Sequence, residues 1–159
     1  MTTNSSPNPA HQQMQKTILT VHANRTNSET AEIAARDWQA ELATTSMKPV
    51  PAPRPTELLL GALGACMIAG IEREAQANHL RIDDVQVSVT AARLPPPAPL
   101  LETLKVRVTV FSPEPEARLR PILDALETNG TVTNTLKLGS PIDIISQVRS
   151  RLNLHGRSA

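Results

Sequence analysis

Aromatic residues are scarce in this chain, which has one Trp, one Phe and no Tyr among its 159 residues. Proteins that hold single-stranded nucleic acid usually stack its bases on aromatic side chains in a basic groove. This sequence offers neither feature, because its formal net charge is only +1. We therefore expect no nucleic-acid partner, and we expect a core made of Val, Ile, Leu and Ala.

Long hydrophobic runs are also absent. The longest uncharged apolar run, residues 58–71, is bracketed by Glu57 and Glu72. It is shorter than the roughly 20 residues that a helix needs to cross a bilayer. We interpret this run as a buried helix and expect no membrane partner.

The N-terminus has no secretory pattern, and the chain has a single cysteine. Residues 1–15 are polar, without a basic start or an apolar segment, so they predict a disordered arm before one domain over residues 16–159. Cys66 has no second cysteine with which to form an internal disulfide. A reduced thiol in the cytoplasm is the natural expectation.

Alternating and helical hydrophobic patterns predict an α+β domain. Strands are expected at residues 16–25 and 30–36, as a hairpin around Asn27, and at residues 38–42. After a Pro-rich connector, the patterns predict further elements in the following order: a helix over residues 55–78, strands over 85–91 and 104–110, a helix from Ser112 to Asn129-Gly130 with Pro121 as a kink or as its true start, a turn over 133–137, and a strand over 141–145.

The helix over residues 55–78 is apolar almost all the way round. A surface helix shows one apolar stripe, so this helix must be covered on every side. Gly61, Gly64 and Gly70 lower its helix propensity, and close approach of another backbone would compensate for that cost. Together these features predict a homodimer.

Few residues offer catalytic or metal-binding chemistry. His11, His22, His79 and His155 stand alone, without partners at ligand spacing, and no phosphate-binding loop or serine-hydrolase motif is present. The sequence therefore predicts no metal and no cofactor. Cys66 is the remaining candidate for catalytic chemistry. A lone cysteine in an apolar helix is more often a packing residue than a nucleophile.

A family resemblance favours a nucleophilic role for Cys66 over a packing role. Residues 55–66, Pro-Thr-Glu-Leu-Leu-Leu-Gly-Ala-Leu-Gly-Ala-Cys, resemble the signature of the OsmC/Ohr family, in which a buried helix leads to a peroxidatic cysteine. Residues 80–89, 131–136 and 140–144 resemble later segments of the same family. The resemblance covers roughly residues 21–145, and the predicted element order is the order of that family.

The resemblance implies antiparallel strands around a long central helix, in an intertwined homodimer. It also implies a thiol peroxidase, an antioxidant oxidoreductase of the stress response, in which Cys66 reduces organic hydroperoxides or hydrogen peroxide. The family places an arginine and a glutamate at this site. Arg25 is the candidate arginine by its spacing before Cys66, with Arg54 as a rival and a solvated surface position as the alternative for Arg25.

Glu57 is the candidate acid of the site. It lies nine residues before Cys66, about half a turn away around a straight helix. In the Ohr branch the acid is one residue earlier, at the position of Thr56, so the role of Glu57 comes from the branch with Pro-x-Glu-Leu-Leu-Leu. The alternative is a first-turn acid that the helix dipole favours.

The resolving cysteine of the peroxidase members is missing. When residues 134–136 are matched to the family, Gly130 occupies its position. An internal disulfide step is impossible, so oxidised Cys66 would need an external thiol reductant. Three hypotheses follow: a one-cysteine peroxidase, a non-enzymatic dimer that binds a hydrophobic small molecule, and a structural dimer in which Cys66 is only packing.

Overall fold

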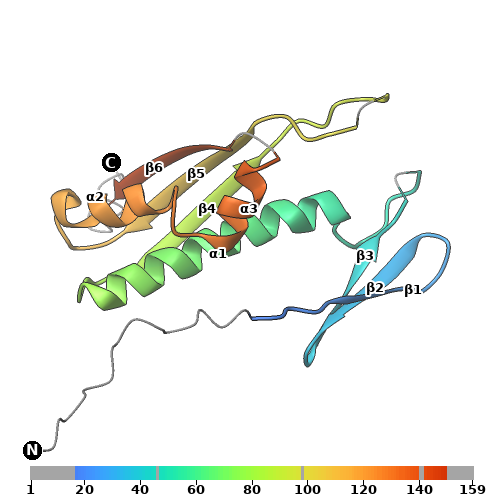
Figure 1. Cartoon of the computed structure of the whole chain (residues 1–159), viewed down its shortest axis with the longest axis horizontal. Helices are drawn as coiled ribbons and strands as arrows, with labels where there is room; N and C mark the ends of the chain where they lie inside the picture. The colour runs from blue at the N-terminus through green and yellow to red at the C-terminus, as the bar shows by residue number, and fades with distance from the viewer. Residues whose placement is uncertain (1–16, 46, 98, 140–141, 150–159) are drawn as a thin grey trace, which may run out of the picture. The chain divides into compact units, whose positions relative to one another are not determined.

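The computed structural model describes residues 17–45, 47–97, 99–139 and 142–149 (Figure 1). The chain divides into two compact units, Met1–Pro53 and Arg54–Ala159, and each is described by itself. The predicted arm over residues 1–15 lies outside the described residues. The predicted α+β class is confirmed.

The N-terminal unit is a three-stranded antiparallel sheet of β1 (His22–Arg25), β2 (Thr30–Ala35) and β3 (Trp38–Ala43). The first turn forms because Asn27 Oδ1 accepts hydrogen bonds from the backbone N–H groups of Glu29 at 2.7 Å and Thr30 at 2.9 Å. The hairpin around Asn27 is therefore confirmed. Its first strand is shorter than predicted, since residues 17–21 are not in a strand.

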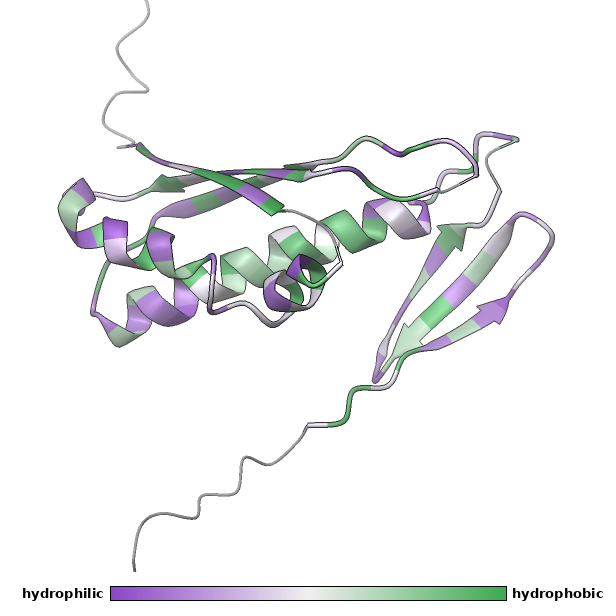
Figure 2. Ribbon diagram, turned by 45° about the horizontal axis from the view of Figure 1, so that its top comes forward, coloured by the Kyte–Doolittle hydropathy of each residue, from purple (hydrophilic) through white to green (hydrophobic). Residues whose placement is uncertain are grey.

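The C-terminal unit places three helices on one face of a second sheet (Figures 1 and 2). Its elements are α1 (Pro55–Ala77), β4 (Asp84–Thr90), β5 (Leu104–Phe111), α2 (Glu116–Ala125), α3 (Thr131–Lys137) and β6 (Ile142–Arg149). β5 is the central strand, antiparallel to β4 and parallel to β6. The parallel pair requires the crossover that α2 and α3 provide.

The core of this unit lies between α1, the sheet and the C-terminal end of α2. Its buried members are Leu63, Met67, Ile71 and Ala75 of α1, Leu104, Val106, Val108 and Val110 of β5, and Ile122, Leu123 and Leu126. The β5 residues are those whose alternation predicted a buried face. They hold α1 against the sheet and so fix the position of Cys66.

Three elements of this unit differ from the sequence prediction. The helix predicted from Ser112 to Asn129-Gly130 is the shorter α2, and Pro121 lies inside it. Residues 131–137 form the helix α3 where a turn was expected, because Val132 and Leu136 pack on the core and Thr133 is fully buried. These contacts outweigh the low helix propensity of a Thr-rich segment. β6 extends to Arg149, four residues beyond the predicted end of the last strand, because it pairs along the whole length of β5.

α1 begins at Pro55, and Glu57 accepts a hydrogen bond at Oε2 from the backbone N–H of Arg54 at 2.8 Å. By length and composition alone this helix could cross a membrane, a test that the core helices of many soluble proteins also pass. No backbone approaches its glycines closely among the described residues. A Cβ on Gly64 would meet the Val87 and Val89 side chains at 3.5 and 3.6 Å, and one on Gly61 would meet nothing within 4 Å.

Candidate functional site

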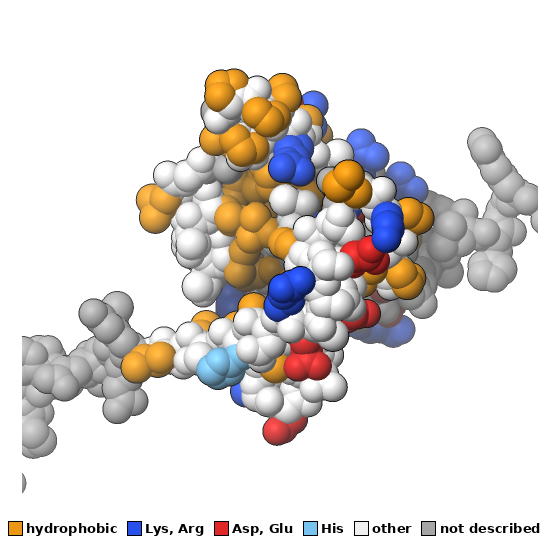
Figure 3. Space-filling view, turned by 90° about the vertical axis from the view of Figure 1, so that its right-hand side faces the viewer, with side chains coloured by type: hydrophobic (Ala, Val, Ile, Leu, Met, Phe, Trp, Pro, Cys, Tyr) orange, Lys and Arg blue, Asp and Glu red, His pale blue; other side chains and the backbone are white. Residues whose placement is uncertain are grey.

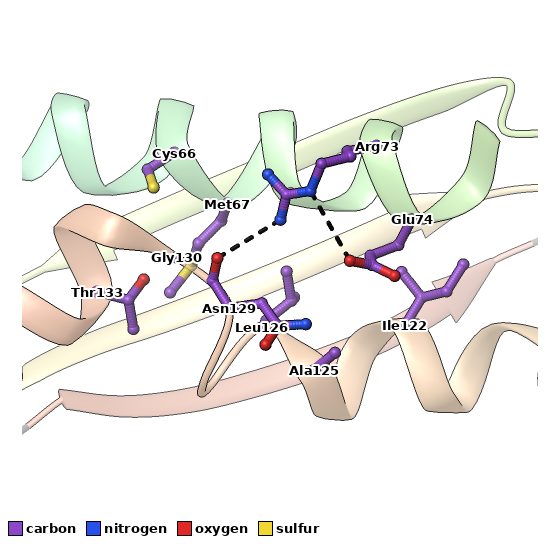
Figure 4. A pocket seen from close by; sticks show the side chains of 11 residues that line it. Cys66, Met67, Arg73, Glu74, Ile122, Ala125, Leu126, Asn129, Gly130 and Thr133 are labelled. Carbon is purple, nitrogen blue, oxygen red and sulfur yellow. Dashed lines mark hydrogen bonds and ion pairs between the residues drawn. The ribbon is translucent and has the colours of Figure 1, made fainter. Parts of the chain in front are cut away.

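Cys66 lies half-buried in a pocket where α1 meets the segment from α2 to α3 (Figure 4). The pocket holds about 240 Å³ of empty space, part of it open to solvent. It is lined by Cys66, Met67, Gly70, Arg73 and Glu74 of α1 and by Ile122, Ala125, Leu126, Asn129, Gly130 and Thr133. Most of the wall is apolar, with the thiol at one end and two charged side chains at the other.

Gly130 lies directly beside the thiol. A Cβ on this residue would be 3.4 Å from Cys66 Sγ and 2.7 Å from Thr133 Oγ1. The backbone of Gly130 has φ −98°, a conformation open to any residue, so dihedral strain does not require glycine here. The packing is instead tight, because a Cβ here would have to displace Thr133. We call this close contact of Gly130 with the sulfur and the hydroxyl the Gly130 slot.

Thr133 brings an unpaired hydroxyl to the slot. Its side chain is fully buried, and its Oγ1 has no hydrogen-bond partner among the described residues. Figure 4 shows this oxygen on the side of Thr133 that faces Gly130 and Cys66. A buried hydroxyl without a partner costs about 1–3 kcal/mol. A hydrogen-bond partner that reached this oxygen would remove this cost.

Arg73 and Glu74 supply the charges of the pocket. Arg73 Nη2 donates to the backbone oxygen of Asn129 at 3.5 Å, and its Nε lies 3.8 Å from Glu74 Oε1. The first distance is long for a hydrogen bond and the second is long for an ion pair. The Arg73 side chain is 58% exposed. The guanidinium therefore lies over the pocket without being tightly held.

The predicted site residues fall in different places. Cys66 is in the pocket, whereas Glu57 lines a separate groove between α1 and β4. Arg25 is the last residue of β1, in the N-terminal unit, where its Nε donates to the backbone oxygen of Asn27 at 3.0 Å. Arg54 immediately precedes α1. The roles of Arg25 and Glu57 stay predictions.

Sequence reasoning did not identify Arg73 or Thr133. Cys66, Gly70 and Arg73 are spaced four and three residues apart along α1, the spacing of one helix face, so a search of that face would have found Arg73. Thr133 gave no such signal, because its segment was expected to be a turn. The match of Gly130 to the position of the resolving cysteine agrees with its place beside Cys66 Sγ.

No group of three or more His, Cys, Asp or Glu side chains that could hold a metal ion occurs within residues 17–45, 47–97, 99–139 and 142–149. The chemistry available in the pocket is that of a thiol, a hydroxyl, a guanidinium and a carboxylate. A thiolate can attack an electrophilic oxygen or sulfur.

Solved structures with this fold come from several bacteria. An OsmC-like protein from Mycoplasma pneumoniae is 19% identical, with a TM-score of 0.76 over 84% of this chain and 99% of its own. The organic hydroperoxide resistance protein OhrB of Bacillus subtilis is 11% identical, with a TM-score of 0.62 over 82% of this chain and 98% of its own. An organic hydroperoxide resistance protein OsmC from Legionella pneumophila is 15% identical, with a TM-score of 0.57 over 83% and 98%.

At these low identities the structural likeness shows a shared fold alone. No curated protein sequence matches the chain. The family model for OsmC-like proteins matches residues 46–145, which is more than half of the chain and includes Cys66, Gly130 and Thr133. The chain therefore belongs to the family of OsmC-like proteins.

Proposed function

We propose that this protein is a cytoplasmic thiol-dependent peroxidase that reduces organic hydroperoxides or hydrogen peroxide at Cys66. The observation that carries the proposal is the position of the thiol, half-buried at the end of an apolar-walled pocket and close to a buried hydroxyl that has no partner among the described residues. An apolar wall suits the organic part of a hydroperoxide, and a buried donor suits its oxygen. The hydroperoxide resistance proteins named above share the fold.

The first half-reaction oxidises Cys66. Its thiolate attacks one peroxide oxygen, the O–O bond breaks, and the sulfur keeps that oxygen as sulfenic acid. Two electrons pass from the sulfur to the peroxide, and the second oxygen leaves as an alcohol, or as water, after taking a proton. In this proposal Thr133 Oγ1 donates a hydrogen bond to the peroxide oxygen next to the sulfur.

The second half-reaction needs an external thiol, because Cys66 is the sole cysteine. A first thiol displaces the sulfenic oxygen as water and forms a mixed disulfide with Cys66. A second thiol then releases Cys66 as its thiol and leaves as a symmetric disulfide. The net reaction converts one hydroperoxide and two thiols into one alcohol, one water and one disulfide.

Peroxide consumption tests this function. With cumene hydroperoxide or tert-butyl hydroperoxide and an excess of dithiothreitol or 2-mercaptoethanol, we expect catalytic loss of peroxide that disappears in Cys66→Ser. Trapping of the sulfenic acid with dimedone, read by intact mass, should label the wild type and not the variant. Absence of both turnover and dimedone labelling would reject the proposal.

The homodimer is part of the proposal. The groove between α1 and β4 is mostly apolar, and Leu59 is 39% exposed. Among the described residues, no atom lies within 4 Å of where a Cβ on Gly61 would stand. Further hydrophobic side chains are visible on the surface in the space-filling view (Figure 3). A second copy of the chain would cover the groove and bring Glu57, and a partner's Arg25 or Arg54, into a shared site.

The same groove favours a second candidate function, the binding of a hydrophobic small molecule without catalysis. It holds about 770 Å³ of empty space that includes open solvent, between Leu60 and Ile68 of α1 and Val87 and Val89 of β4. Its cavity volume of about 440 Å³, which leaves that open space out, lies within the range of small-molecule sites. Native mass spectrometry separates the two, since a retained apolar ligand in Cys66→Ser would support binding, whereas a ligand-free dimer would support the peroxidase.

A further inference from the structure

We propose that the pocket at Cys66 is a site for one oxygen atom, the oxygen that a peroxide leaves on the sulfur, and that Thr133 Oγ1 holds this oxygen. The sulfenic acid of Cys66 therefore persists until an external thiol reduces it, and it resists a second oxidation. The inference rests on the first half-reaction of the proposed peroxidase. It adds a protection of the oxidised sulfur, which matters because the chain has no second cysteine to react with it.

The enclosed part of the pocket at Cys66 is very small. Its cavity volume is about 10 Å³ once the space that is open to solvent is left out. One water molecule needs a cavity of about 10–15 Å³ by this measure. The enclosed room therefore suits a single oxygen atom bonded to Cys66 Sγ, and it is too small for two.

Cys66 Sγ and Thr133 Oγ1 both lie close to Gly130. A Cβ on Gly130 would stand 3.4 Å from the sulfur and 2.7 Å from the hydroxyl oxygen, so the two atoms are no farther apart than the sum of these distances. Even so, Thr133 Oγ1 makes no hydrogen bond to the sulfur or to any other described atom. An oxygen bonded to the sulfur on this side brings a hydrogen-bonding atom one bond length closer to the hydroxyl.

The hydroxyl of Thr133 is an independent sign of a polar group at this place. The side chain is fully buried, its oxygen is unpaired within the described residues, and Figure 4 shows that oxygen on the side facing Cys66. A hydroxyl both donates and accepts, so it can donate to a sulfenate or accept from a sulfenic acid. Pairing removes the cost of the buried hydroxyl, and this gain arises only when the sulfur carries an oxygen.

The same packing opposes a second oxidation. In that step the sulfur of the sulfenate attacks another peroxide, the O–O bond breaks, and the sulfur loses two more electrons and keeps a second oxygen. The other peroxide oxygen leaves as an alcohol, or as water, after taking a proton. Gly130 and Thr133 leave no room for the added oxygen, since even a Cβ on Gly130 would stand 3.2 Å from Thr133 Cβ. Met67 and Leu126 of the same pocket are apolar and offer it no donor.

The test follows the second oxidation of Cys66 by itself. Reduced protein receives one equivalent of hydrogen peroxide to form the sulfenic acid, and then an excess of hydrogen peroxide without any thiol. Intact mass distinguishes the sulfenic acid, which is one oxygen heavier than the thiol, from the sulfinic acid, which is two oxygens heavier. Dimedone added at intervals counts the sulfenic acid that remains, and its decay gives the rate of the second oxidation.

We expect the sulfenic acid to decay several-fold faster in Thr133→Val, which keeps the shape of the side chain and loses the hydroxyl. Thr133→Ala also enlarges the cavity, so its decay should be faster still. The matched control is Thr30→Val, which removes the other buried hydroxyl without a partner among the described residues and should behave as the wild type. Alkylation of reduced Cys66 by iodoacetamide should proceed equally in the wild type and in Thr133→Val, because the exposure of the sulfur is unchanged.

Equal decay rates in the wild type and both Thr133 variants would overturn the proposal. It also fails if Thr133→Val accelerates alkylation as much as the second oxidation, because exposure would then explain both rates. Failure of the peroxidase itself is distinguishable. A wild-type sulfenic acid that persists, without peroxide turnover when a thiol is added, supports this inference and contradicts the catalytic cycle, whereas turnover with rapid passage to the sulfinic acid does the reverse. A Cys66 that takes up no oxygen rejects both.

Discussion

At the scale of single residues, the absence of a side chain at Gly130 determines what can reach Cys66. The φ angle at this position suits any residue, and the contacts that a Cβ would make are with Thr133 and with Cys66 Sγ. A side chain at Gly130 would therefore have to displace Thr133 to fit beside the Cys66 sulfur. If Cys66 is oxidised as we propose, its reduction depends on a partner from solution, because the chain has no second cysteine.

Replacement of Gly130 by cysteine should restore an internal partner. The new Cβ would lie 3.4 Å from Cys66 Sγ, a separation compatible with a disulfide. We expect Gly130→Cys to form a bond with Cys66 under mild oxidation, seen as loss of both free thiols and of the mass of two hydrogens. Thr133 Oγ1, at 2.7 Å from the new Cβ, must shift, so Gly130→Cys with Thr133→Ala should oxidise faster.

Gly139→Cys is the matched control, because no atom of the described residues lies within 4 Å of where its Cβ would stand. Its thiol should stay free under the same oxidation. If Gly130→Cys remains as reactive toward a thiol reagent as Gly139→Cys, the closeness of Gly130 to Cys66 is contradicted.

Thr133 should show a conflict between stability and activity. Thr133→Val keeps the shape of the side chain and removes a buried hydroxyl that has no partner within the described residues. We expect the free energy of unfolding to rise by about 1 kcal/mol in urea titrations. The rate of Cys66 oxidation by peroxide should fall several-fold, because the donor to the peroxide oxygen is lost.

Thr30→Val provides the comparison for stability, since Thr30 Oγ1 is likewise buried and without a partner among the described residues. Both variants should stabilise the protein by similar amounts. Destabilisation in Thr133→Val alone would mean that its hydroxyl already has a partner in the folded chain, and the proposed donor role would then be lost.

At the scale of helices and strands, the sequence predicted what depends on local periodicity. Alternation along β5 identified its buried Leu104, Val106 and Val108. Pro55 and Glu57 marked the start of α1, where the Glu57 carboxylate accepts a hydrogen bond from the Arg54 amide. Asn27 marked the first turn because its side chain can bond the backbone just after it.

Elements that depend on distant contacts were not predicted. α3 carries five residues of low helix propensity in Thr131–Lys137 and forms because Val132 and Leu136 reach the core. The parallel pairing of β5 with β6 joins segments separated by two helices. No local pattern encodes such a pairing, because it arises only when α2 and α3 return the chain to the sheet.

At the scale of the whole molecule, the candidate site could be predicted only where one element carries it. Cys66 and its helix were found from the sequence, whereas Gly130 was found through the family resemblance. Arg73 and Thr133 became visible when α1 met α3 in space. The covering of α1 belongs to the same scale. The sequence predicted that α1 is buried on every side, and the described residues leave the groove between α1 and β4 uncovered.

Gly61 tests whether a second copy covers that groove. Within the described part of the chain, no atom lies within 4 Å of where its Cβ would stand, so a bulky side chain there should leave the fold of one chain intact. In a homodimer the same side chain would occupy the space of the partner. We expect Gly61→Trp to shift the protein from dimer to monomer in size-exclusion chromatography with light scattering, while its far-ultraviolet circular dichroism stays that of the wild type.

Gly139→Trp adds the same bulk at another open position and should leave the mass in solution unchanged. If the site is shared between subunits, the monomeric Gly61→Trp should also lose peroxide turnover, although its Cys66 would still exchange with small disulfides in its own pocket. A wild-type protein that is already monomeric would contradict the dimer. Full turnover by monomeric Gly61→Trp would instead confine the site to α1, α2 and α3 of one chain and remove the need for Arg25 from a partner.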